Sequence, residues 1–278
     1  MHPTSHLTHA AILLLAASVV LTAQERQDKD PDQNVRNPKQ VTPVEIGVGG
    51  DVRRENPYQS EAEALRPAHV HLRWASRYVT EGRDNLDGDP LTSLSSEVAF
   101  GNLTFTPWLA YSSDTDYTEL DLNLVYGRRL TDQLDLYAGY NHIQAHLPGD
   151  NAHDNKVSLD LIYTPTSLFD LLASAYHSFD ADGAFWKLAL RREQILNDKT
   201  ILTFRSILGG NEGYVPQGHD GLNHAQLRLN LAYYPAPRIE LTSFAAYNIA
   251  IDSDPQRHPE DENLHDFFFA GLGIVYHF

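Results

Sequence analysis

The sequence contains no cysteine and only one methionine among its 278 residues. The lack of cysteine excludes disulfide frameworks, thiolate metal sites, cysteine nucleophiles and an acylated N-terminal cysteine. Basic residues are also scarce, because 21 Lys and Arg stand against 37 Asp and Glu, which gives a formal net charge of -16. A chain with this charge repels phosphate backbones, so nucleic acid is not expected as a partner.

Long apolar runs are absent after an N-terminal block at residues 10–23, AAILLLAASVVLTA. No later stretch approaches the roughly 20 apolar residues that a transmembrane helix needs, which excludes a helical membrane bundle. A membrane β-barrel remains, because its strands are apolar only at every second position. Its mean hydropathy, here -0.39, therefore resembles that of a soluble protein.

The N-terminal block ends in the small residue Ala23 and is followed by a polar stretch from Gln24. This arrangement is typical of a secretory signal peptide over residues 1–23, although no Lys or Arg precedes the block. An uncleaved N-terminal membrane anchor is the alternative. Residues 24–67 are rich in proline and charge and predict a flexible leader, in which the alternating Val44, Ile46 and Val48 leave open a plug element.

From residue 68 to the end, apolar and polar residues alternate with a period of two. Leu120, Leu122 and Leu124, for example, share one strand face, while Glu119 and Asp121 share the other. This pattern predicts about twelve strands of roughly 9–11 residues, long enough to cross a bilayer at a tilt. The predicted strands are residues 68–80, 95–101, 103–112, 118–126, 134–144, 156–163, 171–179, 184–191, 200–208, 225–233, 238–250 and 267–278.

The connections between these predicted strands alternate between long and short. The six long ones hold 18 acidic residues and only two basic residues, Arg83 and Arg257. The intervening ones are short turns, as in the Gly101-Asn102 turn. Long acidic loops at one end and short turns at the other are typical of an oriented outer-membrane barrel.

The chain ends on an aromatic residue, Phe278, in an alternating segment that also carries Tyr276. This segment resembles the closing strand of bacterial outer-membrane proteins, whose terminal Phe is read by the barrel-assembly machinery. The resemblance implies that Tyr276 and Phe278 form an assembly signal. Further tyrosines close apolar faces near the predicted short turns and predict an aromatic girdle at the turned end. They are Tyr126, Tyr140, Tyr163 and Tyr233.

Residues 74–143 carry short motifs that resemble those of the TorF-type porin family. An S-x-Y-x-x-x-G pattern at the end of the first strand leads into a loop with Asp-Pro, and an acidic hairpin follows. The matching positions are Ser76, Tyr78, Gly82, Asp89, Pro90, Glu119 and Asp121. The sequence departs from the family pattern at Glu81, where an arginine is expected before the glycine. The resemblance implies a pore-like barrel of unassigned substrate without catalytic residues.

Motifs for catalysis are largely missing from the sequence, which has no G-x-S-x-G elbow, H-E-x-x-H, Walker A or complete G-x-G-x-x-G pattern. The second hypothesis is an outer-membrane lipid-modifying enzyme of the phospholipase type that uses His142 with Asn141 and Ser158. Neighbouring strand residues point to opposite faces, which argues against a site shared by Asn141 and His142. We therefore predict no catalytic residues.

Two groups of residues have the chemistry of metal ligands. His69 and His71 share a strand face, which suits zinc if a third ligand is near. The loop acids Asp87, Asp89, Asp261 and Glu262 offer oxygen ligands for calcium. Polar lumen positions and a solvated acidic loop explain the same residues more simply, so no metal and no cofactor is predicted.

The polar strand faces would form the inner wall of the barrel, with charges of both signs. Such charges set the field and the constriction that a permeating solute meets. The candidate pore-lining residues are Arg73, Arg77, Glu119, Asp121, Asp160, Lys187, Arg205 and Arg228. The same predicted face carries Asp135, Lys156, Arg191 and Glu240. If these charges pair across the lumen, they close it, which leaves open a structural or loop-displaying barrel.

The sequence as a whole predicts an all-β protein, a transmembrane antiparallel up-and-down β-barrel over residues 68–278. The predicted function is a porin-like channel in the cell outer membrane for passive diffusion of small hydrophilic solutes. Its expected partners are outer-membrane lipid and lipopolysaccharide, the barrel-assembly machinery and the solutes themselves.

Overall fold

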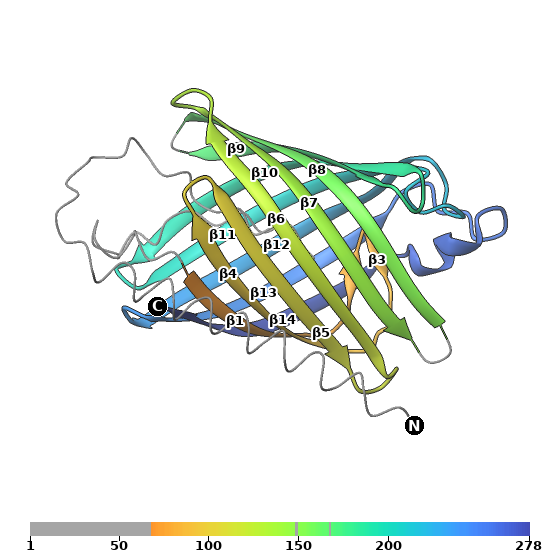
Figure 1. Ribbon diagram of the computed structural model, residues 1–278, viewed down its shortest axis with the longest axis horizontal. Helices are drawn as coiled ribbons and strands as arrows, with labels where there is room; N and C mark the ends of the chain where they lie inside the picture. Colours follow the sequence, from red (N-terminus) through yellow and green to blue (C-terminus); the bar gives the residue numbers. More distant parts are fainter. Residues whose placement is uncertain (1–67, 148–149, 167) are drawn as a thin grey trace. The chain divides into compact units, whose positions relative to one another are not determined.

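Twelve of the described strands form one closed barrel. The computed structural model of the protein describes residues 68–147, 150–166 and 168–278. Twelve strands pair antiparallel in chain order, and β1 pairs with β14 to close the ring (Figure 1). This confirms the predicted up-and-down barrel. The expected signal peptide and the leader with its plug element lie outside the described residues.

Two short elements accompany the barrel strands. A two-stranded hairpin of β2 (Val79–Thr80) and β3 (Arg83–Asp84) lies in the connection between β1 and β4, residues 76–90, which we call loop 1. A short 3-10 helix, η1 (Pro259–Asn263), lies between β13 and β14. Within the described ranges, no helix is long and apolar enough to cross a membrane. The barrel strands are β1 (Ala68–Ala75), β4 (Leu91–Phe100), β5 (Leu103–Ser112), β6 (Tyr117–Arg129), β7 (Leu134–Leu147), β8 (Asp150–Thr166), β9 (Phe169–Ser178), β10 (Gly183–Asn197), β11 (Thr200–Glu212), β12 (Gly221–Ala236), β13 (Ile239–Ala250) and β14 (Phe267–His277).

The strand ends differ from the sequence-based boundaries in two ways. The predicted strand over residues 68–80 stops at Ala75, because the chain then turns into loop 1. Several other strands are longer than predicted, and the connection between β10 and β11 is only residues 198–199. Polar residues at the strand ends still pair in the backbone ladder, as His146 does with Asn151. The strands therefore extend beyond the segments in which apolar residues alternate with polar ones.

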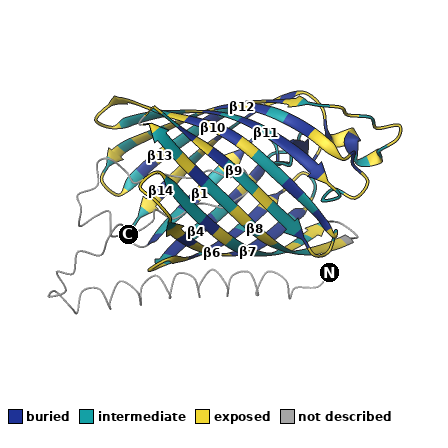
Figure 2. Cartoon of the chain, turned by 90° about the horizontal axis from the view of Figure 1, so that it is seen from above, coloured by how far each residue is buried: buried dark blue, intermediate teal, exposed yellow. Residues whose placement is uncertain are grey.

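The two faces of the barrel strands have opposite character, and Figure 2 shows the resulting alternation of buried and exposed residues along each strand. Outward-facing Leu272 is 62% exposed, whereas inward-facing Glu119 on β6 is only 4% exposed. Charged residues are rarely buried in soluble proteins unless they are paired. An apolar outside around a polar inside is the pattern that a bilayer selects.

Aromatic residues gather outward near both ends of the strands. Near the turned end the exposed tyrosines are Tyr126, Tyr163, Tyr233 and Tyr276. The prediction for Tyr140 was wrong, because it lies in the middle of β7, where its hydroxyl donates to Asn155. Exposed Trp74, Tyr111 and Tyr247 lie near the looped end, and the sequence analysis missed this second group. Two aromatic girdles are typical of membrane barrels.

Candidate functional site in the barrel lumen

Loop 1 folds into the barrel and crosses its lumen. The hydroxyl of Tyr176 on β9 donates a hydrogen bond to Oε1 of Glu81 in loop 1. In the ring of twelve strands, β9 is the sixth neighbour of β1 in either direction and thus lies opposite it. Since loop 1 starts where β1 ends, this contact requires the loop to reach the opposite wall.

Further contacts hold loop 1 to the strands between these two walls. The hydroxyl of Tyr78 donates to Oε2 of Glu119 on β6 at 2.5 Å, and Nδ2 of Asn248 on β13 donates to the carbonyl of Gly82 at 2.8 Å. Gly82 has a φ of +72°, and a Cβ there would lie 2.3 Å from Cγ of His224 on β12. Only glycine fits both the backbone conformation and this close approach.

The S-x-Y-x-x-x-G positions at Ser76, Tyr78 and Gly82 are thus the residues that place loop 1. Ser76 extends the pairing of β1 with β14, because its N–H donates to the carbonyl of Ala270 at 2.8 Å and its hydroxyl accepts from the Ala270 N–H at 3.0 Å. Tyr78 and Gly82 then contact opposite parts of the inner wall. Glu119, another matching position, receives the Tyr78 hydrogen bond.

A buried ionic group joins loop 1 to two other loops at the same end of the barrel. Asp261, whose side chain has 0% exposure, accepts from Nη2 of Arg83 at 3.0 Å and lies 2.7 Å from Nδ1 of His219. We call Arg83, His219 and Asp261 the outer-loop cluster, because they come from residues 76–90, 213–220 and 251–266. The sequence leaves open a solvated acid or a calcium ligand at Asp261, but the Asp261 oxygens accept from the Arg83 guanidinium and the His219 N–H.

The electrostatics of the outer-loop cluster favour the ionised pair. Burial lowers the pKa of the Arg83 guanidinium, and the nearby carboxylate of Asp261 opposes that shift. Burial alone would raise the pKa of Asp261, but hydrogen bonds from the Asp254 backbone and from His219 lower it below its usual 3.8. Both partners are therefore charged at neutral pH, and they stabilise one another away from water.

An arginine row lies on the inner wall of β10, β11 and β12. Arg191, Arg205 and Arg228 are direct register partners across these strands. Arg191 is paired with Asp170 on β9, to which its Nε donates at 2.9 Å and its Nη2 at 2.7 Å. Three guanidinium groups thus lie side by side on this part of the wall.

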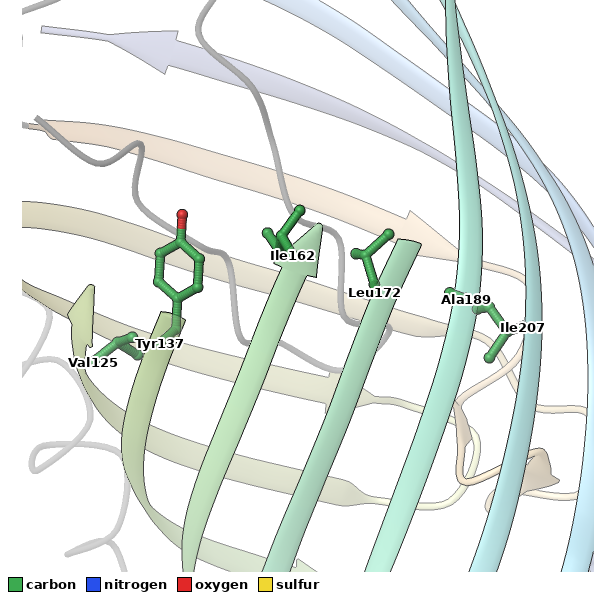
Figure 3. Close-up of a cluster of buried hydrophobic side chains, with 6 residues drawn as sticks. All are labelled: Val125, Tyr137, Ile162, Leu172, Ala189 and Ile207. Atoms are coloured by element: carbon green, nitrogen blue, oxygen red, sulfur yellow. The ribbon is translucent and has the colours of Figure 1, made fainter. Parts of the chain in front are cut away.

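An apolar band lies beside the arginine row, on the side toward the looped end. Ile162, Leu172, Ala189 and Ile207 are register neighbours on β8 to β11 and, with Val125 and Tyr137, form a buried cluster (Figure 3). The sequence analysis missed this band. Its signal is the interruption of strict alternation by consecutive apolar residues, as at Leu188-Ala189-Leu190.

A small opening remains on the side of the lumen formed by β1, β4, β5 and β12 to β14. The guanidinium carbons of Arg73 and Arg228 lie 4.6 Å and 4.0 Å from the ring centre of Phe244. Both arginines line the opening, so their charges face whatever enters it. Other lining residues are Arg77, Tyr78, Ser93, Trp108, Gln226 and Phe269.

The candidate pore-lining residues fall into two groups. Arg73, Glu119, Asp121, Asp160, Lys187, Arg205 and Arg228 lie at inward positions of their strands, which alternate with exposed apolar neighbours. The prediction of a strand position for Arg77 was wrong. Arg77 lies in loop 1, where it pairs with buried Asp84. Asp121 lies beside Glu119 on β6. The structure thus separates acidic β6 from the basic wall of β10 to β12.

The residues of the enzyme hypothesis do not come together. His142 is on the outer face of β7, whereas Asn141 and Ser158 are on the inner face, with Asn141 donating to Asp121 at 3.3 Å. Nδ1 of His142 lies 2.9 Å from Oδ1 of Asn155, and its Nε2 lies 3.0 Å from the amide nitrogen of Gln144. An amide in that place supplies no nucleophile.

The two metal hypotheses also find no support in their geometry. His71 lies 3.5 Å from the hydroxyl of Thr242, and His69 lies 4.0 Å from Glu97. Across residues 68–147, 150–166 and 168–278, no three His, Asp or Glu side chains are grouped closely enough to hold a metal ion.

Comparison with known proteins shows similarity in structure but not in sequence. No protein-family model matches the chain, and no curated protein matches it. Among solved structures, the KdgM porin has a TM-score of 0.53 at 9% identity, covering 76% of this chain and 99% of that chain. The chain has the fold of an outer-membrane porin. The NanC porin gives 0.51 at 11% identity, covering 75% of this chain and 100% of that chain. The KdgM porin in complex with disordered oligogalacturonate gives 0.50 at 8% identity, covering 76% of this chain and 99% of that chain.

Proposed function

We propose that the protein is a porin-like channel of the cell outer membrane, through which small hydrophilic solutes diffuse passively and without covalent chemistry. One observation carries this proposal: the apolar outside of the barrel encloses an inner wall with an arginine row and an arginine-lined opening. Charges that line a lumen set the field and the constriction that a permeating polar solute meets.

The proposed route runs through the opening beside loop 1 and then along the arginine row. Arg73 and Arg228 would act on a passing solute at short range, where a low effective dielectric strengthens their field. Arg205 follows Arg228 along the wall. One structural neighbour is a complex with oligogalacturonate, a hydrophilic solute. The pore-lining role of the predicted charged residues remains part of this proposal.

The proposal also includes membership in the TorF-type porin family and recognition by the barrel-assembly machinery. Membership in the TorF-type porin family is supported by the motif residues that place loop 1, Ser76, Tyr78 and Gly82. Recognition by the barrel-assembly machinery is supported by Phe278, whose N–H donates to the carbonyl of Ala68 at 3.1 Å across the barrel seam. Its ring lies 5.2 Å from that of Tyr276. Lipid and lipopolysaccharide would contact the outward apolar face.

A closed, structural barrel is the second candidate, because loop 1 crosses the lumen and the outer-loop cluster holds it there. The two candidates differ in whether ions pass beside the loop. A planar-bilayer recording of the refolded protein decides between them. We expect discrete conductance steps from protein that shows heat-modifiable mobility. Properly folded protein that gives no current above the lipid background would instead support the closed barrel.

A further inference from the structure

The carboxylate of Glu81 ends in a basic and aromatic site on the wall opposite its own strand. Besides the hydrogen bond from Tyr176, it is attracted by the ammonium groups of Lys187 on β10 and Lys156 on β8. These residues come from three neighbouring strands, β8, β9 and β10. Glu81 is therefore the acidic component that loop 1 supplies to a site built by the barrel wall.

The two lysines are positioned by aromatic rings. Nζ of Lys156 lies 4.8 Å from the ring centre of Tyr214, and Nζ of Lys187 lies 5.2 Å from that of Tyr176. Tyr176 stacks on Phe185 at 5.7 Å and meets Tyr214 edge-on at 5.0 Å. Ammonium groups over aromatic faces keep favourable interactions in the absence of a counter-ion. The site thus persists when a carboxylate leaves.

The charge of Glu81 is matched to this site. Burial alone would raise its pKa, but Lys187, Lys156 and hydrogen bonds from Thr80 and Tyr176 lower the pKa below its usual 4.5. The site therefore prefers the ionised carboxylate. Asp154 lies 3.7 Å from Lys156, and Asp160 and Arg205 both act on Lys187, so the group around Glu81 contains charges of both signs.

The loop holds Glu81 there at a conformational cost. Glu81 has a φ of +49°, in the left-handed region that disfavours side chains, and Gly82 follows at +72°. A non-glycine residue in this region is strained. Because β2 and β3 pair with each other, the tip of loop 1 can withdraw without breaking the barrel ladder. The contact of Glu81 with the barrel wall can therefore break and form again while the barrel stays folded.

We propose that Lys156, Lys187 and Tyr176 form a binding site for the carboxylate of a small permeating solute, and that Glu81 fills this site when no solute is present. The inference rests on the proposed channel function and names its solute class as carboxylates. A carboxylate of the solute takes the place of the Glu81 carboxylate, and the loop tip moves aside. Loop 1 then acts as an internal competitor for the solute.

Binding to the refolded protein tests this proposal without any measurement of current. Isothermal titration calorimetry with gluconate gives the affinity for a hydroxylated carboxylate, and sorbitol is the matched neutral probe. Glu81→Gln keeps the shape of the side chain but removes the competing charge. We expect gluconate to bind this variant about tenfold more tightly than the original protein, which corresponds to a site that is free of Glu81 about a tenth of the time.

Matched variants separate competition from general charge effects. Glu262→Gln removes an exposed acid from a neighbouring loop and should leave gluconate affinity unchanged. Lys187→Gln, combined with Glu81→Gln, should abolish the gain, and sorbitol should bind none of the variants. Equal gluconate affinity in the original protein and in Glu81→Gln overturns the proposal, as does retained tight binding without Lys187.

Gluconate binding and conductance test the carboxylate site and the channel function separately. If folded protein binds gluconate as expected but never conducts, the channel function is wrong and the carboxylate site stands. If the protein conducts but Glu81→Gln leaves gluconate affinity unchanged, the channel stands and the site assignment is wrong. Heat-modifiable mobility of every variant confirms that each is folded.

Discussion

The looped half and the turned half of the lumen use charge in different ways. In the looped half, charged groups bind across large separations in sequence, as Arg83 does with Asp261 and Glu81 with Tyr176. In the turned half, they bind register neighbours on adjacent strands, as Arg191 does with Asp170 and Arg129 with Asp135. The first arrangement holds a loop in place, and the second builds a wall.

The barrel wall and loop 1 also differ in how firmly they are held. The wall is part of a continuous backbone ladder, so its charges are held in fixed positions. Loop 1 is held mainly by side chains, so a change in one contact can shift its position without unfolding the barrel. Constriction is therefore expected to depend on the looped half, and selectivity along the pore on the turned half.

Removal of the tip of loop 1 should have the largest effect. We expect replacement of residues 79–84 by a Gly-Ser linker to raise single-channel conductance several-fold, because the chain that crosses the lumen is gone. Replacement of residues 179–182, an exposed connection between β9 and β10, is the control and should leave conductance near the original value. An unchanged conductance after loss of the loop tip would mean that loop 1 does not limit the passage.

Deletion of Phe278 tests the turned half. Its N–H bonds to Ala68 where the first and last strands meet. We expect the deletion to reduce the amount of heat-modifiable protein in the outer membrane several-fold while export to the periplasm continues. Cell fractionation measures both. Substitution of Phe278 by Tyr keeps a terminal aromatic ring and should restore most of the yield, whereas equal yields from deletion and original would contradict an assembly role.

Asp261→Asn breaks the outer-loop cluster. Loss of one partner leaves Arg83 buried beside a neutral amide, and such a change costs about 3–5 kcal/mol in buried ion pairs. We expect faster protease cleavage within residues 76–90 and 251–266, with unchanged heat-modifiable mobility of the barrel. Exposed Glu262→Gln is the control. Protease resistance equal to that of the original protein would show that the cluster does not hold the loops.

Acid should weaken the loop arrangement of the looped half. Both Asp261 and Glu81 have lowered pKa values in the folded protein, so their ionisation stabilises the loop arrangement above the unfolded values of 3.8 and 4.5. This stabilisation is lost as the pH falls through the lowered folded values. We expect conductance to rise when recordings go from about pH 7 to about pH 3. The rise should be smaller in Glu81→Gln, and a fall in conductance would contradict this sign.

Arg228→Gln should have the smallest effect, a shift in reversal potential toward cations. Because Arg228 faces the opening, its field acts at short range and should persist at high salt. Charges on exposed loops such as Glu262 are screened within about 10 Å at 0.1 M salt and about 3 Å at 1 M. Neutralisation of Glu262 should therefore matter only at low salt. Equal salt dependence of both variants would contradict separate roles for wall and loops.

Much of the barrel was predictable because its faces obey a local rule. Leu120, Leu122 and Leu124 lie on the opposite side of β6 from Glu119 and Asp121, since successive side chains of a strand point to opposite faces. The same rule anticipated inward positions for Arg205 and Arg228. It failed at Arg77, because the strand ends two residues earlier, and it missed Ile162 and Ile207, which are apolar although they face inward.

The sequence by itself determined the strands and their two faces, because both depend on residues that are close in the chain. It did not determine the length of every connection, since Asp150 and Asp154, predicted in a long loop, lie in β8. The tertiary structure alone decided where loop 1 lies. Tyr78 meets Glu119, Glu81 meets Tyr176 and Arg83 meets Asp261 across 41, 95 and 178 positions. No periodicity marks such pairs, since they form only when twelve strands close into a ring and bring distant side chains to the same height in the lumen.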